Sequence, residues 1–193
     1  MFRRSLPLLC LLLAASSFIA CGDPPDKEMQ QAQGAIDAAK AVGADEYAPD
    51  EFAAAQAALK NAGDAVDQRD YRLALNHALD ARDRAKTAAQ QAADRKARAR
   101  VDADRAIAAA AVALVDVRAH LKAAEASRAP AKTVADARRA IESSDEAVQK
   151  AREDLERGAY LPALDGAKAA TKRLQSVGKD LESKTTAGPR RRH

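Results

Sequence analysis

Residues 71–127 read YRLALNHALDARDRAKTAAQQAADRKARARVDADRAIAAAAVALVDVRAHLKAAEAS. This stretch contains no proline and no glycine, so nothing in it interrupts an α-helix. A continuous helix of this length would extend for roughly 85 Å at 1.5 Å per residue. Its first part repeats alanine at spacings of three and four, the seam pattern of packed helices. These seam residues are Ala74, Ala78, Ala81, Ala85, Ala88 and Ala92.

The middle of this stretch, residues 94–105 (DRKARARVDADR), presents no wide apolar face, which predicts a solvent-exposed bridging helix. The sequence therefore predicts one long central helix with an apolar seam near each end. The second seam consists of Ile107, Ala111, Leu114, Val117, Leu121 and Ala124.

Shorter helices are predicted on both sides of the central one. The first covers residues 26–42 and stops at Gly43, and the second begins near Pro49, because proline suits the first turn of a helix. A further helix follows Pro130, and a turn at residues 157–159 leads to the last helix. The predicted seams are Met29, Ala32, Ile36 and Ala39; then Phe52, Ala55, Leu59, Ala62 and Val66; then Val134, Ala137, Ile141, Ser144, Val148, Ala151 and Leu155; and finally Leu164, Ala167, Leu174, Val177 and Leu181.

The composition favours helices over other folds. Of the 193 residues, 51 are alanine, 31% are charged and only 3% are aromatic. Alanine buries little area, so a large core of interlocking side chains is not expected. The scarcity of β-branched and aromatic residues argues against a sheet-based enzyme. The predicted fold class is all-α, with elongated antiparallel helical hairpins or a coiled coil around the long central helix.

The seams superpose when the chain is shifted by 89 residues. Each copy is predicted to be a helical hairpin with a tyrosine just past its turn, where the ring can wedge between the two helices. A partly exposed tyrosine at a loop is the alternative. The first copy also resembles the turn of a tetratricopeptide repeat, but the offset is not the roughly 34 residues of such an array, so we infer local convergence. The matched turn residues are Tyr71 with Tyr160, Ala74 with Ala163, and Leu75 with Leu164.

Residues 1–20 are predicted to be a signal peptide. Arg3 and Arg4 precede an uncharged apolar stretch at residues 6–20, which is short for a membrane span and suits a signal sequence. The end of this stretch, FIAC at residues 18–21, resembles the lipobox of bacterial lipoproteins. This resemblance implies cleavage between Ala20 and Cys21 and a lipid anchor on Cys21, such as diacylglycerol with palmitate. An ordinary cleavage after Ser16, or an unmodified Cys21 thiol, are the alternatives.

The lipoprotein resemblance also implies a location. Gly22, and not aspartate, follows the cysteine, which implies the outer membrane with the protein facing the periplasm. Cys21 is the one cysteine left after cleavage, so a disulfide or a thiolate metal site is not expected. The mature chain has a net charge of +2, with both signs interspersed, which argues against nucleic-acid binding.

Two motifs carry a second resemblance. The segment YAPDE at residues 47–51 precedes a predicted helix, and DYRLA at residues 70–74 opens the next one. With these motifs, residues 30–100 resemble an uncharacterised family of alanine-rich bacterial lipoproteins. Some of its members continue into a peptidoglycan-binding domain, whereas residues 101–193 of this chain stay alanine-rich throughout. The predicted organisation is a signal peptide at 1–20, a lipidated tether at 21–25, helical hairpin regions at 26–100 and 101–184, and a disordered basic tail at 185–193.

The sequence presents no pattern of catalytic or metal-binding residues. His77, His120 and His193 have no ligand spacing, and the acidic residues alternate with basic ones along the predicted helices. No enzyme activity, cofactor or metal is expected. Because the chain ends in His193, the link to peptidoglycan through a C-terminal lysine, known in the major murein lipoprotein, is not carried over.

These features predict a lipid-anchored structural protein of the bacterial envelope, acting as a scaffold or spacer on the periplasmic side near peptidoglycan. The alternative is an accessory subunit that docks its alanine-rich helix faces, above all residues 74–92, on one envelope protein. The same faces are candidates for self-association.

Overall fold

The computed structural model describes residues 23–186, and within this range every element of regular structure is helical. The all-α fold and the unbroken central helix are thereby confirmed. The predictions for the signal peptide, for Ala20 and Cys21, and for the end of the basic tail lie outside the described residues. The helices are α2 (Asp26–Ala41), α3 (Ala44–Tyr47), α4 (Pro49–Asp67), α5 (Tyr71–Ala126), α6 (Ala131–Glu156) and α7 (Tyr160–Thr186).

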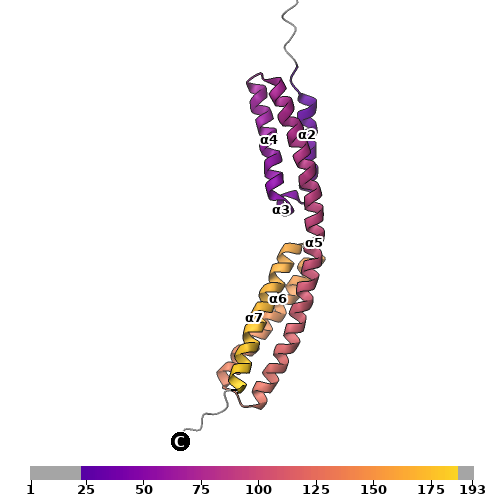
Figure 1. Cartoon of the computed structure of the whole chain (residues 1–193). Helices are drawn as coiled ribbons and strands as arrows, with labels where there is room; N and C mark the ends of the chain where they lie inside the picture. The colour runs from indigo at the N-terminus through magenta and orange to yellow at the C-terminus, as the bar shows by residue number, and fades with distance from the viewer. Residues whose placement is uncertain (1–22, 187–193) are drawn as a thin grey trace, which may run out of the picture. The chain divides into compact units, whose positions relative to one another are not determined.

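The described chain divides into two units at Arg95, five residues before the predicted boundary at residue 100. Helix α5 contributes its first part to one unit and its second part to the other. In the first unit, α2 and α4 lie beside α5, and α3 closes one end (Figure 1). In the second unit, α6 and α7 pack along α5 (Figure 1). Each predicted hairpin is therefore joined by a further helix, so that three long helices share each core.

The two hairpin turns form the same backbone hydrogen bonds at an offset of 89 residues, as the repeat predicts. Each turn pairs a six-to-one bond with a five-to-two bond, the Schellman motif that satisfies the last carbonyl groups of a helix. In the first turn, Asp70 N donates to Ala65 O at 2.9 Å and Arg69 N to Val66 O at 2.8 Å; in the second, Ala159 N donates to Asp154 O at 2.8 Å and Gly158 N to Leu155 O at 3.0 Å.

The first unit is packed mainly through alanine. Ala32 of α2, Ala58 of α4 and Ala81 of α5 form one cluster, with the half-buried Leu59 packed against it. The whole predicted alanine seam from Ala74 to Ala92 is fully buried. Small side chains allow helix backbones to approach closely, but each buries little apolar area.

The predicted register of α4 is wrong at two positions. Ala58 and Ala65 are buried, where the seam predicted Leu59 and Val66, which are half-buried. Helix α4 packs against two neighbours, so its buried face is wider than a two-helix seam and its centre shifts by one residue. The same reason accounts for Ala110, which is buried in place of the predicted Ala111.

Three further expectations need correction. The segment at 94–105 is mostly exposed, but its Ala99 and Ala103 are buried. The short helix α3 follows Gly43, where the sequence analysis expected only a stop. Several predicted seam residues lie at the edges of their cores and are half-buried, namely Met29, Leu121, Val134, Leu155, Leu164 and Val177.

The second unit has larger side chains in its core. Leu174 and Leu181 of α7 and Val148 of α6 are almost completely buried. Polar contacts join its helices at the surface: Arg118 of α5 pairs with Asp145 of α6 at 3.3 Å. The core cluster consists of Ile107, Ala110, Leu114, Val117, Ala124, Ala137, Ile141, Val148, Ala151, Ala167, Ala170, Leu174 and Leu181.

We expect Ala81→Glu to unfold the first unit. Ala81 is completely buried, and an unpaired carboxylate there has neither water nor a partner, which costs about 3 kcal/mol or more. Ala93→Glu is the matched control, because Ala93 is exposed on the same helix. Urea denaturation followed by circular dichroism measures both. Equal stabilities of the two variants would contradict the packing described.

Candidate functional site

The structure places the predicted hairpin residues at the two turns, one in each unit. Tyr71 and Tyr160 are the first residues of α5 and α7, and both rings are half-buried. Ala74 and Ala163 are completely buried one turn further on, while Leu75 and Leu164 are half-buried. Each turn belongs to its own unit, and each set of residues lies at the end of a helix.

Each turn contains one residue with a left-handed backbone, and the two turns differ in the identity of that residue. Arg69 has φ of 59°, and the residue 89 positions later, Gly158, has φ of 81°. A side chain is strained in this region, and glycine is not. The first turn has a compensating feature, because Asp70 Oδ1 accepts a hydrogen bond of 2.9 Å from Leu73 N and caps α5.

We expect Arg69→Gly to stabilise the protein by about 0.5 kcal/mol, since it relieves the left-handed strain but increases the freedom of the unfolded chain. Arg72→Gly, three residues further on in α5, is the control and should destabilise by about 1 kcal/mol. The midpoints of urea denaturation measure both changes. A lower midpoint for Arg69→Gly would contradict the interpretation of this turn.

A buried carboxylate lies at the end of α6. The side chain of Asp154 is only 10% exposed, and it occupies the position that Ala65 has in the first unit. Arg157 donates a hydrogen bond to Asp154 Oδ1, and Lys150 Nζ lies 3.6 Å from Oδ2. The hydrogen bond from Arg157, together with the charge of Lys150, holds the pKa of Asp154 below its ordinary value, although burial acts in the opposite direction.

We expect this carboxylate to make stability depend on pH. A carboxyl group whose pKa is lowered by folding stabilises the protein above its unfolded pKa of about 3.9, and this contribution is lost as the pH falls through the folded value. Asp154→Asn should therefore lower the Tm by a few degrees near neutral pH, and the difference from wild type should shrink below about pH 4. Asp136→Asn, at an exposed pair with Arg139, is the control. A constant difference at all pH values would contradict the assignment.

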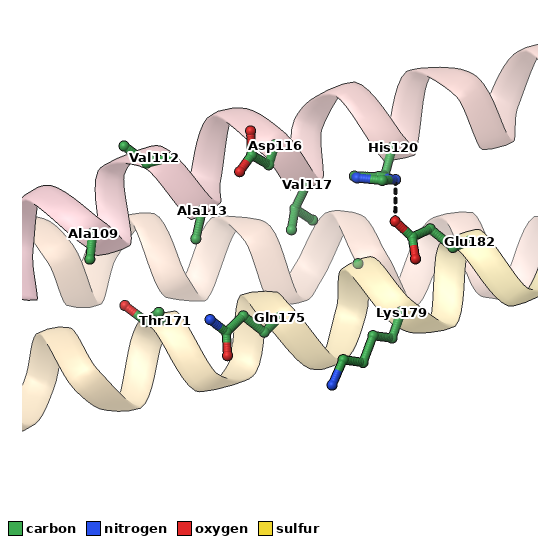
Figure 2. A pocket seen from close by; sticks show the side chains of 11 residues that line it. Ala109, Val112, Ala113, Asp116, Val117, His120, Thr171, Gln175, Lys179 and Glu182 are labelled. Atoms are coloured by element: carbon green, nitrogen blue, oxygen red, sulfur yellow. Dashed lines mark ion pairs between the residues drawn. The ribbon is translucent and has the colours of Figure 1, made fainter.

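A concave surface lies between α5 and α7 in the second unit, and we call it the α5–α7 groove. Two adjoining stretches, of about 710 Å³ and 510 Å³, share Ala109, Thr171 and Gln175. Figure 2 shows the first stretch, with α5 on one side and α7 on the other. The groove exists because the facing residues are small: a Cβ added at Gly178 would lie 3.5 Å from Val117 Cγ2.

Charged residues stand along the rims of this groove. His120 Nδ1 lies 3.5 Å from Glu182 Oε1 at one end, the contact dashed in Figure 2. Lys179 extends from α7 away from α5 (Figure 2), and Lys168 and Lys172 line the second stretch. The groove is thus apolar and small-sided along its walls and charged at its edges. This arrangement suits the docking of an extended or helical segment.

This surface was not predicted from the sequence, although the sequence contains a signal for it. The run AIAAAAVALV at residues 106–115 is apolar at ten consecutive positions, and a helix cannot bury all of its sides against two neighbours. Val112 and Val115 are accordingly 62% and 65% exposed. A second signal is the net charge of each unit. The two units have net charges of opposite sign, which nearly cancel in the net charge of the described chain.

Among residues 23–186, no three histidine, cysteine or acidic side chains gather in a way that could hold a metal ion. No helix in the same range combines the length and the apolar character that a membrane span requires.

Comparison with known families gives one result. Residues 27–104 match a domain of unknown function, DUF4398. The matched range covers α2, α3 and α4 and the first part of α5, and it ends a few residues past the boundary of the first unit. No curated protein and no solved structure matches the chain. The N-terminal part of this all-α chain is thus similar to that domain.

Proposed function

We propose that the chain is a lipid-anchored structural protein of the bacterial cell envelope, without catalytic chemistry, that acts as a scaffold or spacer on the periplasmic side of the outer membrane. The observation that carries this proposal is the order of features along the chain: a positive start, an uncharged apolar stretch, the FIAC segment, and then a helical domain. Cys21 is the residue on which the anchor depends.

The helical part supports this proposal through its distance from the anchor. Only residues 22–25 separate Cys21 from the start of α2, and two of these are proline, which makes a short and stiff connection. A lipid on Cys21 would hold the first unit close to the membrane surface. Two or three acyl chains make such an anchor firm, because each buried methylene contributes about 0.8 kcal/mol.

The surface available for contact with other envelope components differs from the one that the sequence analysis favoured. The alanine seam from Ala74 to Ala92 is covered by the chain's own helices α2 and α4. An accessory subunit that docks on one envelope protein would therefore use exposed residues such as those of the α5–α7 groove. A scaffold needs no such single partner, and we favour it for that reason.

We expect the mature N-terminus to be Cys21 with a thioether-linked diacylglycerol. Full-length protein expressed in a Gram-negative bacterium and extracted with detergent would be digested, and its N-terminal peptide measured by mass spectrometry. Cys21→Ser should abolish the lipid and cause the precursor to accumulate uncleaved. Cys10→Ser is the matched control and should change neither the lipid nor the cleavage site.

Two outcomes would overturn the proposal. An unmodified peptide that begins at Ser17 would show ordinary signal cleavage, and an unmodified Cys21 at the N-terminus would show cleavage without an anchor. A separate fractionation of the outer and inner membranes tests the location, with enrichment in the outer membrane as the expected result.

A further inference from the structure

The exposed valines of α5 have no role in the bundle to which they belong. Val112 and Val115 are the two most exposed large apolar residues described, and the run that contains them also includes the exposed Ala108 and Ala109. Valine is a poorer helix former than alanine, because its branched side chain loses freedom in a helix. At exposed positions this cost brings no burial within the unit. The chain uses alanine at most comparable places, so the valines indicate burial against another molecule.

The α7 rim of the groove that Val112 lines is basic. Lys168, Lys172 and Lys179 stand along one side of α7, and no ion pair joins them to an acidic residue of the described chain. On the α5 side of the groove, the charged lining residues are Asp102, Arg105 and Asp116, two of which are acidic. An occupant of this groove would therefore bury apolar surface against α5 and offer carboxylates to α7.

The chain itself contains an occupant of this kind. Residues 23–95 hold fourteen acidic and nine basic side chains, a net charge of −5, whereas residues 96–186 hold fourteen acidic and eighteen basic ones, a net charge of +4. The acidic excess is concentrated in α3 and the start of α4. There Asp45, Glu46 and Asp50 are exposed, and none of them forms an ion pair with another described residue. These carboxylates follow one another along a short stretch, as the lysines do on α7.

We propose that the α5–α7 groove of one molecule binds the first unit of a second copy of this chain. The acidic segment at residues 45–50 of the second copy faces Lys168 and Lys172, and its exposed helix surface covers Val112. The contact is head-to-tail, because the two surfaces that meet are different ones. It goes beyond the scaffold function proposed above and does not depend on the lipid anchor.

The test is sedimentation velocity on residues 21–193 carrying Cys21→Ser, which retain every described residue. We expect self-association that increases with protein concentration and weakens at least tenfold between about 20 mM and 500 mM NaCl, because salt screens the contacts between carboxylates and lysines. Val112→Ser should weaken association at least threefold without a change of charge, which separates a fitted contact from general attraction between opposite charges. Circular dichroism confirms that each variant is folded.

A charge exchange gives the sharpest form of this experiment. One variant carries Lys168→Glu and Lys172→Glu, the other carries Asp45→Lys and Glu46→Lys, and each alone should lose association at least tenfold. Mixed together, the two variants should associate again, because each offers a surface complementary to the other. Lys132→Glu combined with Arg152→Glu, both exposed on α6, is the control with the same change of charge and should associate like wild type.

Several results would overturn the proposal. These are a monomer at every concentration and salt, association that salt does not weaken, a Val112→Ser variant that associates like wild type, and a mixture of the two exchanged variants that stays monomeric. A monomer in solution would leave the groove to a different occupant, such as a helix of another envelope protein or an anionic lipid surface.

Discussion

Close packing of helices across alanine holds the first unit together and contributes to the core of the second. An alanine at the contact lets two helix axes approach to the short end of the usual range of about 8–10 Å, so that backbone atoms also take part in the packing. The contribution of each alanine is small, because apolar burial stabilises by about 25 cal/mol per Å². Stability must therefore come from many successive turns. This requirement explains why α5 extends over 56 residues without a glycine or proline.

The two units meet this requirement differently. At the offset of 89 residues, Ala85 and Ala92 of the first unit correspond to Leu174 and Leu181 of the second, and all four are buried. In the first unit, an aromatic ring of α3 occupies part of the volume that the smaller alanines leave at this end of α5. Tyr47 of α3 is buried with its ring against Gly43, whose left-handed backbone a larger residue would not adopt without strain. Arg95 of α5 donates a hydrogen bond of 3.1 Å to Tyr47 O, which ties α3 to the central helix.

The sequence was most informative where a pattern was long. The seam at residues 74–92, the absence of breakers in α5 and the turns 89 residues apart all predicted what the structure contains. It was less informative where one helix packs against two neighbours, because the buried face is then wider than a single seam of residues spaced by three and four. The seam predicted for α4 therefore included the larger Leu59, whereas Ala58 is the buried residue. The short α3 has no periodicity of its own, since four residues make barely one turn. The groove could not be derived from either helix alone, because it results from small residues on α5 and α7 that meet only in the folded unit.

A weak contact between copies gains strength from the anchor that we propose. Proteins confined to one leaflet meet at a much higher effective concentration than in solution, so a contact that is marginal in dilute solution can still hold neighbours together. Weak ionic contacts suit this situation, because they form and release quickly and exclude partners of the wrong charge. The net charges of −5 and +4 on the two units then attract the unlike units of two copies to each other, which a uniformly neutral surface would not do. Anchoring explains how such a contact is populated, and the contact explains why the exposed Val112 is tolerated in a helix rich in alanine.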